Sequence, residues 1–200
     1  GLVEDLLQGC GFPEHSIQIA YGGKTTGQQL VSGKPDQIFF TGSVATGRKI
    51  MQTAAQYLIP VTLELGGKDA MIVFDDVNLE RTVNGALWGA FTNAGQSCTS
   101  VERLYVQRSI YPQFIDLLQQ KAAQLRSKAS TEDFDNRDIG TMTAPFQIEV
   151  LKQQLKDAEA KGAQVLCGGQ HEAGSLFFPP TVIIKVDHSM EIMQNESFGP

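Results

Sequence analysis

Phe91-Thr92-Asn93-Ala94-Gly95-Gln96-Ser97-Cys98-Thr99-Ser100 places one cysteine in a loop that follows a predicted helix and precedes a predicted strand. Apolar residues at positions 79, 83, 86, 87 and 91 have the spacing of one buried helical face, and Arg103-Leu104-Tyr105-Val106 reads as a strand. We expect Gly95 to break the helix and three hydroxyl side chains to surround the Cys98 thiol. Reactive groups are often carried on loops of this kind, so Cys98 is a candidate nucleophile.

A second stretch, Pro60-Val61-Thr62-Leu63-Glu64-Leu65-Gly66-Gly67, is an apolar strand that carries one carboxylate and stops at two glycines. In an α/β sheet, the end of a strand and a loop after the next helix can meet at the carboxyl edge, where ligands bind. A carboxylate there can take a proton from a thiol or from a water molecule. Cys98 and Glu64 are therefore candidate catalytic residues, although these residues alone leave a purely structural cysteine open.

The composition limits the class of protein. Two hundred residues with 42% hydrophobic content can form one large domain or two small ones with a buried core. A net charge of −6 argues against nucleic acid and anionic membranes as partners, because both attract a basic surface. There is no long apolar run and no recognisable leader, and the three cysteines show no disulfide or metal-site spacing. We therefore expect a cytoplasmic protein that binds no metal.

Strand and helix patterns alternate along the chain, which predicts an α/β fold with a mainly parallel sheet covered by helices. The acidic run at 75–76 is expected to cap a helix, and Ser109 is expected to cap a later one whose first turn contains Pro112. Strands are predicted at 16–20, 37–40, 61–65, 70–74, 103–106, 163–166 and 181–186. Helices are predicted at 2–9, 43–54, 79–91, 110–125 and 145–161, the last burying Phe146, Val150, Leu151, Leu155 and Ala158.

Thr41-Gly42-Ser43 follows the predicted strand at 37–40 and opens a helix. The free N–H groups and the dipole at the start of a helix favour an anion, so this turn is a candidate phosphate site. The alternative is that Ser43 only caps the helix. The glycine-rich stretch 22–27 lacks the spacing of an ATP-binding loop and is expected to be a turn and helix start.

Four motifs resemble those of the aldehyde dehydrogenase superfamily, in the same order and at similar spacings. They are Val61–Lys68, the Asn93-x-Gly95-Gln96-x-Cys98 loop, Phe40–Ser43, and Glu196–Pro200. Enzymes of that superfamily are more than twice as long, so the chain resembles an interior part without the N-terminal and C-terminal parts. The resemblance implies that residues 1–66 are the C-terminal part of a dinucleotide-binding domain and residues 67–200 most of a catalytic domain.

The resemblance also implies a reaction. Cys98 would add to the carbonyl of a small-molecule aldehyde, hydride would pass to NAD or NADP, and Glu64 would activate the water that hydrolyses the resulting thioester. Glu196 would bind the nicotinamide ribose, with Phe198 beside it. The other residues expected at the cofactor are Thr41, Gly42, Ser43, Leu65 and Gly66. The full-length protein would be a homodimer or homotetramer.

Part of the family's catalytic machinery, including an asparagine that stabilises the oxyanion, lies upstream of the residues present here. We therefore expect these 200 residues alone to have little or no activity. Three alternatives stay open. A CoA-acylating aldehyde dehydrogenase usually lacks a glutamate at the position of Glu64. A cysteine acyl-transfer enzyme or hydrolase without nicotinamide needs a histidine near Cys98, which no motif here supplies. The chain could also fold without doing any chemistry.

Overall fold

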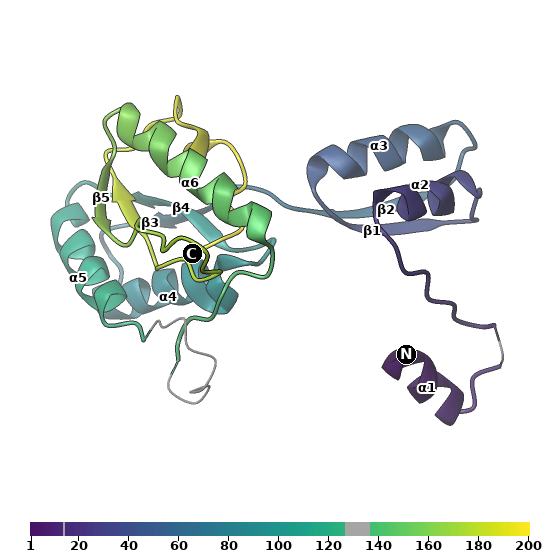
Figure 1. Cartoon of the computed structure of the whole chain (residues 1–200). Coiled ribbons are helices and arrows are strands. Elements are labelled where there is room, and N and C mark those ends of the chain that lie inside the picture. Colours follow the sequence, from purple (N-terminus) through teal and green to yellow (C-terminus); the bar gives the residue numbers. More distant parts are fainter. Residues whose placement is uncertain (14, 127–136) are drawn as a thin grey trace. The chain divides into compact units, whose positions relative to one another are not determined.

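The computed structural model describes residues 1–13, 15–126 and 137–200, which fall into two compact units, Gly1–Leu65 and Gly66–Pro200 (Figure 1). The polar composition of residues 129–143 predicts a loop there, and residues 129–136 of this segment lie outside the described residues.

The first unit is a parallel strand pair with helices. Strands β1 (Ile38–Gly42) and β2 (Val61–Leu65) pair in parallel, and α3 (Val44–Ala55) connects them. Close packing of α3 on β2 depends on Gly47, because a Cβ atom there would lie 2.8 Å from Cδ2 of Leu65. Two further helices precede this pair, α1 (Leu2–Gly9) and α2 (Lys24–Ser32), and α2 contacts α3.

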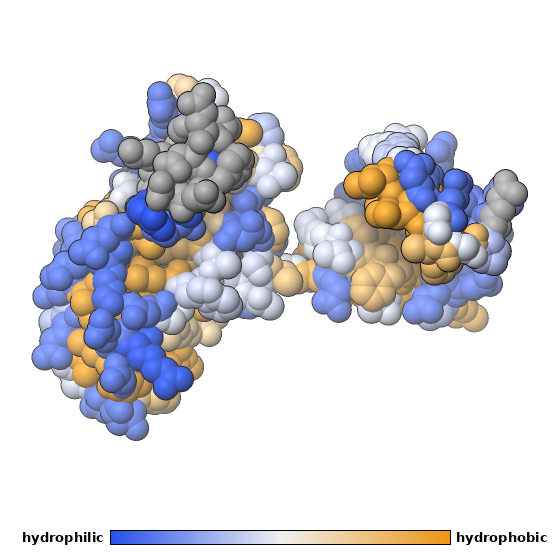
Figure 2. Space-filling model, turned by 90° about the horizontal axis from the view of Figure 1, so that it is seen from below, coloured by the Kyte–Doolittle hydropathy of each residue, from blue (hydrophilic) through white to orange (hydrophobic). Residues whose placement is uncertain are grey.

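The first unit buries little of its own apolar surface. Its buried hydrophobic residues are Ile38 and Ala54, whereas Phe39, Met51 and many others are exposed, and apolar residues at the surface are visible in Figure 2. The strand that we expected at 16–20 does not form. Within the described residues β1 and β2 pair only with each other, and a strand without a neighbour leaves its N–H and C=O groups unpaired.

The second unit contains two more strand pairs. Strands β3 and β4 are parallel, with Ala70 opposite Arg103, and β5 and β6 are antiparallel, with Val165 opposite Ile183. In Figure 1 the strands lie between α6 and the α4–α5 pair. The elements are β3 (Asp69–Val73), α4 (Leu79–Phe91), the 3-10 helix η1 (Thr92–Gly95), β4 (Val101–Val106), α5 (Tyr111–Ala123), α6 (Pro145–Ala160), β5 (Gln164–Cys167), β6 (Val182–Ile184) and the 3-10 helix η3 (Glu191–Met193).

The predicted face of α4 is buried, as expected, at Val83, Ala86, Leu87 and Phe91. The prediction for α6 was wrong at Phe146, which is 70% exposed, and at Val150, which is only partly buried. The buried face of this helix follows the spacing Ile148, Leu151, Leu155 and Ala158, and a residue two places before Ile148 lies off that face.

Two helix caps also differ from expectation. Asn78, not the preceding acids, caps α4, since its Oδ1 accepts from the N–H of Arg81 at 3.0 Å. The Asp75 carboxylate instead accepts from Gln107 at 2.8 Å and from the Ser109 hydroxyl at 2.9 Å. Ser109 therefore tethers a loop to Asp75, and α5 begins after Ile110 with Pro112 in its first turn.

Two of the three strand pairs are parallel and helices cover them, which confirms the predicted α/β class. Among the described residues, no helix is both long enough and apolar enough to cross a membrane.

Candidate active site

The Cys98 loop leaves α4 through an unusual left-handed turn. The helix ends at Phe91, and three successive residues, Asn93, Ala94 and Gly95, have φ values of 54°, 56° and 67°. The sequence predicted that the helix breaks at Gly95, but the break begins earlier, at Asn93. Cys98 follows in a turn closed by the hydrogen bond from Ser100 N–H to the carbonyl of Ser97 at 3.2 Å, and its side chain is exposed.

Gln96 fastens this loop on two sides. Its Nε2 donates to the carbonyl of Asn93 at 3.0 Å, and its Oε1 accepts from the N–H of Thr143 at 2.8 Å. Asn93 in turn donates from Nδ2 to the carbonyl of Gln96 at 3.0 Å. Sequence reasoning treated both residues only as parts of a motif, whereas the structure gives them the role of holding the cysteine turn.

The three hydroxyls near the thiol do not act alike. Ser97 and Thr99 bond to each other at 3.2 Å between their hydroxyl oxygens. Ser100 is 4% exposed, and its hydroxyl lies 3.3 Å from the carbonyl oxygens of both Gly89 and Ala90 in α4. Ser100 therefore fixes the start of β4 rather than polarising the cysteine.

The cysteine loop packs directly on the C-terminal motif Glu196–Pro200. A Cβ atom at Gly95 would lie 2.3 Å from the carbonyl oxygen of Gly199, so only glycine allows this approach of the two backbones. The positive φ of Gly95 adds a second reason for glycine. The structure thus brings two motifs together that lie about a hundred residues apart.

Glu196 lies against another predicted cofactor residue, Gly66. A Cβ atom on Gly66 would lie 1.8 Å from Oε1 of Glu196, so the missing side chain leaves room for the carboxylate. Burial raises the pKa of Glu196, the neighbouring Glu102 carboxylate raises it further, and Lys68 opposes the increase. The carboxylate is half-buried and remains reachable from solvent.

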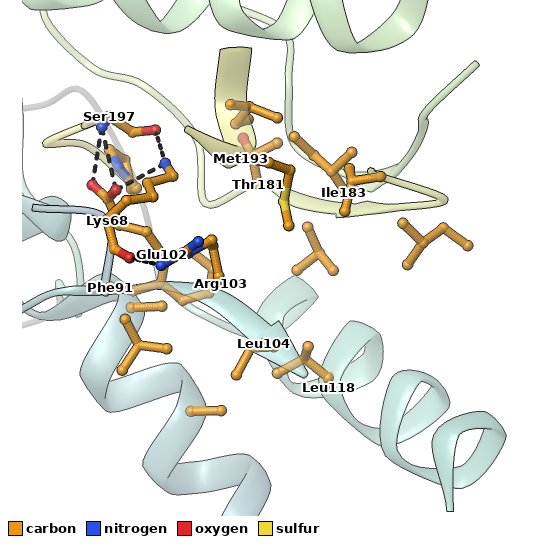
Figure 3. A pocket seen from close by; sticks show the side chains of 18 of the residues that line it. Lys68, Phe91, Glu102, Arg103, Leu104, Leu118, Thr181, Ile183, Met193 and Ser197 are labelled. Atoms are coloured by element: carbon orange, nitrogen blue, oxygen red, sulfur yellow. Dashed lines mark hydrogen bonds and ion pairs between the residues drawn. The ribbon is translucent and has the colours of Figure 1, made fainter. Parts of the chain in front are cut away.

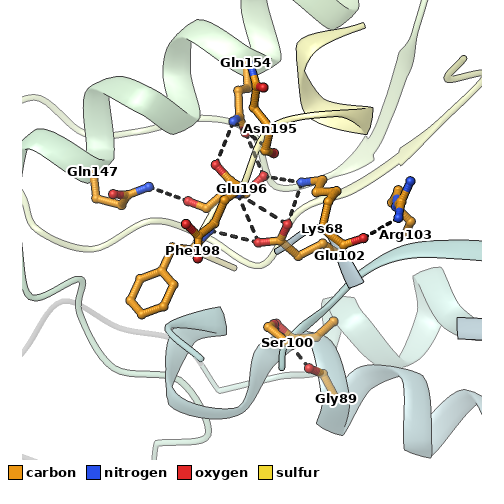
Figure 4. Close-up of polar contacts among 12 residues, drawn as sticks. Lys68, Gly89, Ser100, Glu102, Arg103, Gln147, Gln154, Asn195, Glu196 and Phe198 are labelled. Atoms are coloured by element: carbon orange, nitrogen blue, oxygen red, sulfur yellow. Dashed lines mark hydrogen bonds and ion pairs between the residues drawn. The ribbon is translucent and has the colours of Figure 1, made fainter. Parts of the chain in front are cut away.

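A buried ion pair lies under this motif (Figure 4). Nζ of Lys68 is 2.8 Å from Oε2 of Glu102, and their side chains are 6% and 7% exposed. Lys68 also donates to the Ser197 hydroxyl at 2.6 Å. Burial lowers the pKa of Lys68, and the charge and hydrogen bond of Glu102 act in the opposite direction.

Glu102 and Gln154 hold the backbone of the motif. The Glu102 carboxylate accepts from the N–H groups of Ser197 and Phe198 at 3.0 and 2.9 Å. The side chain of Gln154, which is 2% exposed, accepts from the Ser197 hydroxyl at 2.7 Å and donates to the Glu196 carbonyl at 3.0 Å. Sequence analysis missed Glu102 and Gln154. Gln154 could have been recognised from the sequence, because it is a polar residue on the apolar face of a predicted helix.

In the first unit, the other predicted residues lie together at the carboxyl ends of β1 and β2. Thr41 is opposite Glu64, and Gly42 is opposite Leu65. Ser43 caps α3, because its hydroxyl accepts from the N–H of Thr46 at 3.3 Å. This is the capping role that the sequence analysis gave as the alternative to a phosphate site. The predicted site residues thus form two groups. One lies on the first unit, and the other, Gly66, Cys98, Glu196 and Phe198, lies on the second.

The remaining cysteines and histidines have other environments. Cys10 is exposed, whereas Cys167 is half-buried and its burial raises the pKa of its thiol. His188 bonds to the Tyr105 hydroxyl at 3.1 Å and His171 to the Ser175 carbonyl at 2.8 Å. No group of three potential metal ligands occurs among the described residues.

A cavity of about 470 Å³ lies in the second unit beside this network (Figure 3). Strand β4 and residues 181–186 form opposite walls, most of the lining is apolar, and Lys68 and Ser197 are among its polar residues. Cys98, Glu196 and Phe198 do not line it. The cavity therefore adjoins the Glu196–Pro200 motif but does not include these three predicted side chains.

Residues 2–200 match the sequence profile of the Aldehyde dehydrogenase family. The chain is 40% identical over 199 residues to 4,4'-diapolycopene aldehyde oxidase of a Methylomonas species, and 39% identical over 183 residues to the NADP-dependent succinate-semialdehyde dehydrogenase of Escherichia coli. These alignments cover 100% and 90% of the chain and 36% of each relative.

Solved structures of aldehyde dehydrogenases are also similar to this chain. Betaine aldehyde dehydrogenase of Staphylococcus aureus, in complex with NAD+, matches with a TM-score of 0.93 and 34% identity over 100% of this chain and 40% of that one. Succinate-semialdehyde dehydrogenase of Burkholderia pseudomallei matches with a TM-score of 0.92 and 32% identity over 98% of this chain and 41% of that one. The chain spans well under half the length of these relatives, and it belongs to the aldehyde dehydrogenase family.

Proposed function

We propose that the full-length protein containing this chain oxidises a small-molecule aldehyde to a carboxylic acid with NAD or NADP as hydride acceptor. The observation that carries the proposal is the packing of the Cys98 loop on the Glu196–Pro200 motif through Gly95 and Gly199. This packing brings the loop that carries the candidate nucleophile, Cys98, against the motif that carries Glu196, a carboxylate suited to bind ribose hydroxyls.

In the proposed reaction, the Cys98 thiol loses its proton to solvent and its Sγ bonds to the carbonyl carbon of the aldehyde, while the π electrons of the C=O bond move onto the oxygen; this double bond forms again when the hydride leaves. When bound, the nicotinamide accepts the hydride that leaves this carbon, and Cys98 is then held in a thioester. Glu64 takes a proton from a water molecule, the water oxygen bonds to the acyl carbon, and the C–S bond breaks to release the acid. Glu64 lies near the C-terminal end of β2 and its side chain is exposed.

The residues present fit a dinucleotide. On the second unit, Glu196 can accept hydrogen bonds from ribose hydroxyls in the space left by Gly66, and Phe198 offers an aromatic surface. On the first unit, Thr41, Gly42 and Ser43 lead into the start of α3, where free N–H groups favour a phosphate. Leu65, which lies opposite Gly42 at the end of β2, is the last of the residues that we propose to contact the cofactor. We propose that residues 1–66 are the C-terminal part of a dinucleotide-binding domain and residues 67–200 most of a catalytic domain, a boundary one residue beyond the division into compact units, in which Gly66 belongs to the second.

Among the relatives are enzymes named for succinate semialdehyde and for betaine aldehyde, and for NADP as well as NAD+. We therefore leave the substrate at the level of a small-molecule aldehyde and the cofactor at NAD or NADP. The acidic net charge is unfavourable for nucleic acid or an anionic membrane surface. We further propose a cytoplasmic homodimer or homotetramer.

The test is an assay of the purified full-length protein against short aliphatic, long aliphatic, aromatic and semialdehyde substrates with each cofactor. Formation of reduced nicotinamide is followed by absorbance, and the product is identified as a free acid or an acyl-CoA. Cys98→Ser should abolish turnover, whereas Cys10→Ser, at an exposed cysteine of the first unit, should leave it unchanged. Failure of the wild-type protein on every aldehyde would contradict the proposal.

A further inference from the structure

The segment from Glu196 to Phe198 belongs to no helix or strand, so its shape depends on side-chain partners. One of these partners is Glu102 on β4, a strand that begins three residues after Cys98. One carboxylate oxygen, Oε1, accepts both successive N–H groups of this segment, from Ser197 and from Phe198. The protein's own carboxylate thus occupies the kind of backbone concavity that usually binds an external anion.

This contact compensates for an unfavourable backbone. Phe198 has a φ of 48°, a conformation that costs a residue with a Cβ atom free energy unless its surroundings fix it. The conformation also determines the direction in which the Phe198 ring and the neighbouring Glu196 side chain leave the backbone. Removing the acceptor should therefore release both groups, even if the rest of the unit stays folded.

The charge of Glu102 is compensated within the same cluster. Lys68 pairs with Glu102 and donates to Ser197, and the cluster excludes most solvent. Removing one member of a buried pair leaves an unpaired charge, while replacing both by neutral residues of similar volume is often tolerated. A test of Glu102 must therefore change Lys68 as well.

We propose that Glu102 is a positioning residue for cofactor binding: by accepting the N–H groups of Ser197 and Phe198, it holds Glu196 and Phe198 in the orientation that binds the nicotinamide half of the dinucleotide. This inference rests on the proposed function. Because β4 follows the Cys98 turn directly, the same strand carries the nucleophile's loop and supports the cofactor's carboxylate.

The test compares two double variants in the full-length protein, Lys68→Met with Glu102→Gln, and Lys68→Met with Glu102→Met. The two have the same charge and nearly the same side-chain volume, but only the glutamine retains an oxygen that can accept the two N–H groups. We expect the dissociation constant for NAD or NADP to be about tenfold or more higher for the methionine variant than for the glutamine variant. Glu80→Gln, which breaks the exposed pair with Lys121, is the control and should change nothing.

A second readout does not involve the cofactor. Hydrogen exchange of the peptide covering 195–200, measured by mass spectrometry, should be faster in the methionine variant than in the glutamine variant, while peptides from α4 and α5 exchange alike in both. A loss of stability alone would accelerate exchange in all of them. Should the methionine variant not fold, Glu102→Asp replaces it, since it keeps the charge but withdraws the acceptor by one methylene.

Equal cofactor affinity in the two double variants, with normal binding by the wild type, would overturn this inference and leave the proposed function intact. Absence of nicotinamide dinucleotide binding by the wild-type full-length protein would overturn both. Weaker binding confined to the methionine variant, together with faster exchange at 195–200, supports the positioning role.

Discussion

Gly66 and Glu196 lie so close that a Cβ atom on the glycine would be 1.8 Å from a carboxylate oxygen of the glutamate. Gly66 directly follows β2, the strand that carries Glu64, and Glu196 lies near the C-terminal end of the described chain. The obstructing atom is the end of a flexible side chain, so a substitution at Gly66 can be accommodated by moving the carboxylate. This makes the pair a sensitive test of the cofactor site.

Gly66→Ala should displace the Glu196 carboxylate with little loss of stability. We expect the full-length protein to bind NAD or NADP about tenfold or more weakly, because hydrogen bonds to a charged group are lost. Fluorescence titration with the reduced cofactor measures this. Gly85→Ala, in α4 where a Cβ atom has no neighbour within 4 Å, is the matched control and should leave affinity unchanged. Equal affinities in the two variants would remove Gly66 from the site.

Gly95→Ala should destabilise the second unit and disturb the Cys98 loop. The left-handed backbone alone costs alanine about 1 to 2 kcal/mol, and the overlap with the Gly199 carbonyl adds to this. Gly162→Ala separates the two causes, because Gly162 has a φ of 97° but no neighbour within 4 Å of a Cβ atom. Urea unfolding of the 200-residue chain should show the larger loss for Gly95. Similar losses in both variants would mean that the loop does not need the close approach.

Glu196→Gln should stabilise the chain at neutral pH. Because burial and the Glu102 charge raise the pKa of Glu196, its ionised form is disfavoured in the folded state, so the stability contributed by the protonated form is present below the ordinary carboxyl pKa and is lost as the pH rises through the raised one. Thermal unfolding should therefore show a higher Tm for the variant at neutral pH and a smaller difference at acidic pH. Glu159→Gln, at an exposed position on α6, is the control. A lower Tm for Glu196→Gln at neutral pH would contradict the prediction.

Periodicity predicted the elements that bury one clear face. Leu79 to Phe91 repeats apolar residues at helical spacing, and the helix is present with that face buried. Phe146 shows the limit, because its hydrophobicity suggested burial while its position relative to Ile148 puts it at the surface. The strand expected at 16–20 failed for a different reason, since a strand also requires a partner and local pattern cannot supply one.

In the candidate site, too, local sequence predicted some residues but not the tertiary contacts that hold them. A short motif suggested Cys98 as a nucleophile and resemblance suggested Glu196 as a cofactor ligand, but neither could show which residues hold these two in place. Glu102 and Gln154 are recognisable only once distant segments are folded together, since each bonds to residues more than forty positions away. Helix caps were mispredicted at Asp75 because a carboxylate can serve a tertiary contact as readily as a helix end.

Cys98 should be the most reactive of the three thiols towards iodoacetamide near neutral pH. Cys167 should be the slowest, because burial raises the pKa of its thiol and restricts access. Cys10 is exposed like Cys98 and serves as the internal comparison for a thiol outside the candidate site. Alkylation time courses with peptide mapping on the full-length protein give the three rates. A Cys10 rate equal to that of Cys98 would count against a special role for the loop.

Glu64→Gln in the full-length protein should separate the two halves of the proposed reaction. Formation of the thioester needs no activated water, whereas its hydrolysis does, so the first turnover of cofactor reduction should keep its amplitude while steady turnover slows about 100-fold or more. Rapid-mixing absorbance of the reduced nicotinamide measures both phases. Asp36→Asn, at an exposed carboxylate in the loop before β1, provides the control and should leave both phases intact. A steady rate that is unchanged in Glu64→Gln would assign the base to another residue. Loss of the first turnover would instead give Glu64 the task of activating Cys98, because a thiol that cannot lose its proton cannot form the initial bond to the aldehyde.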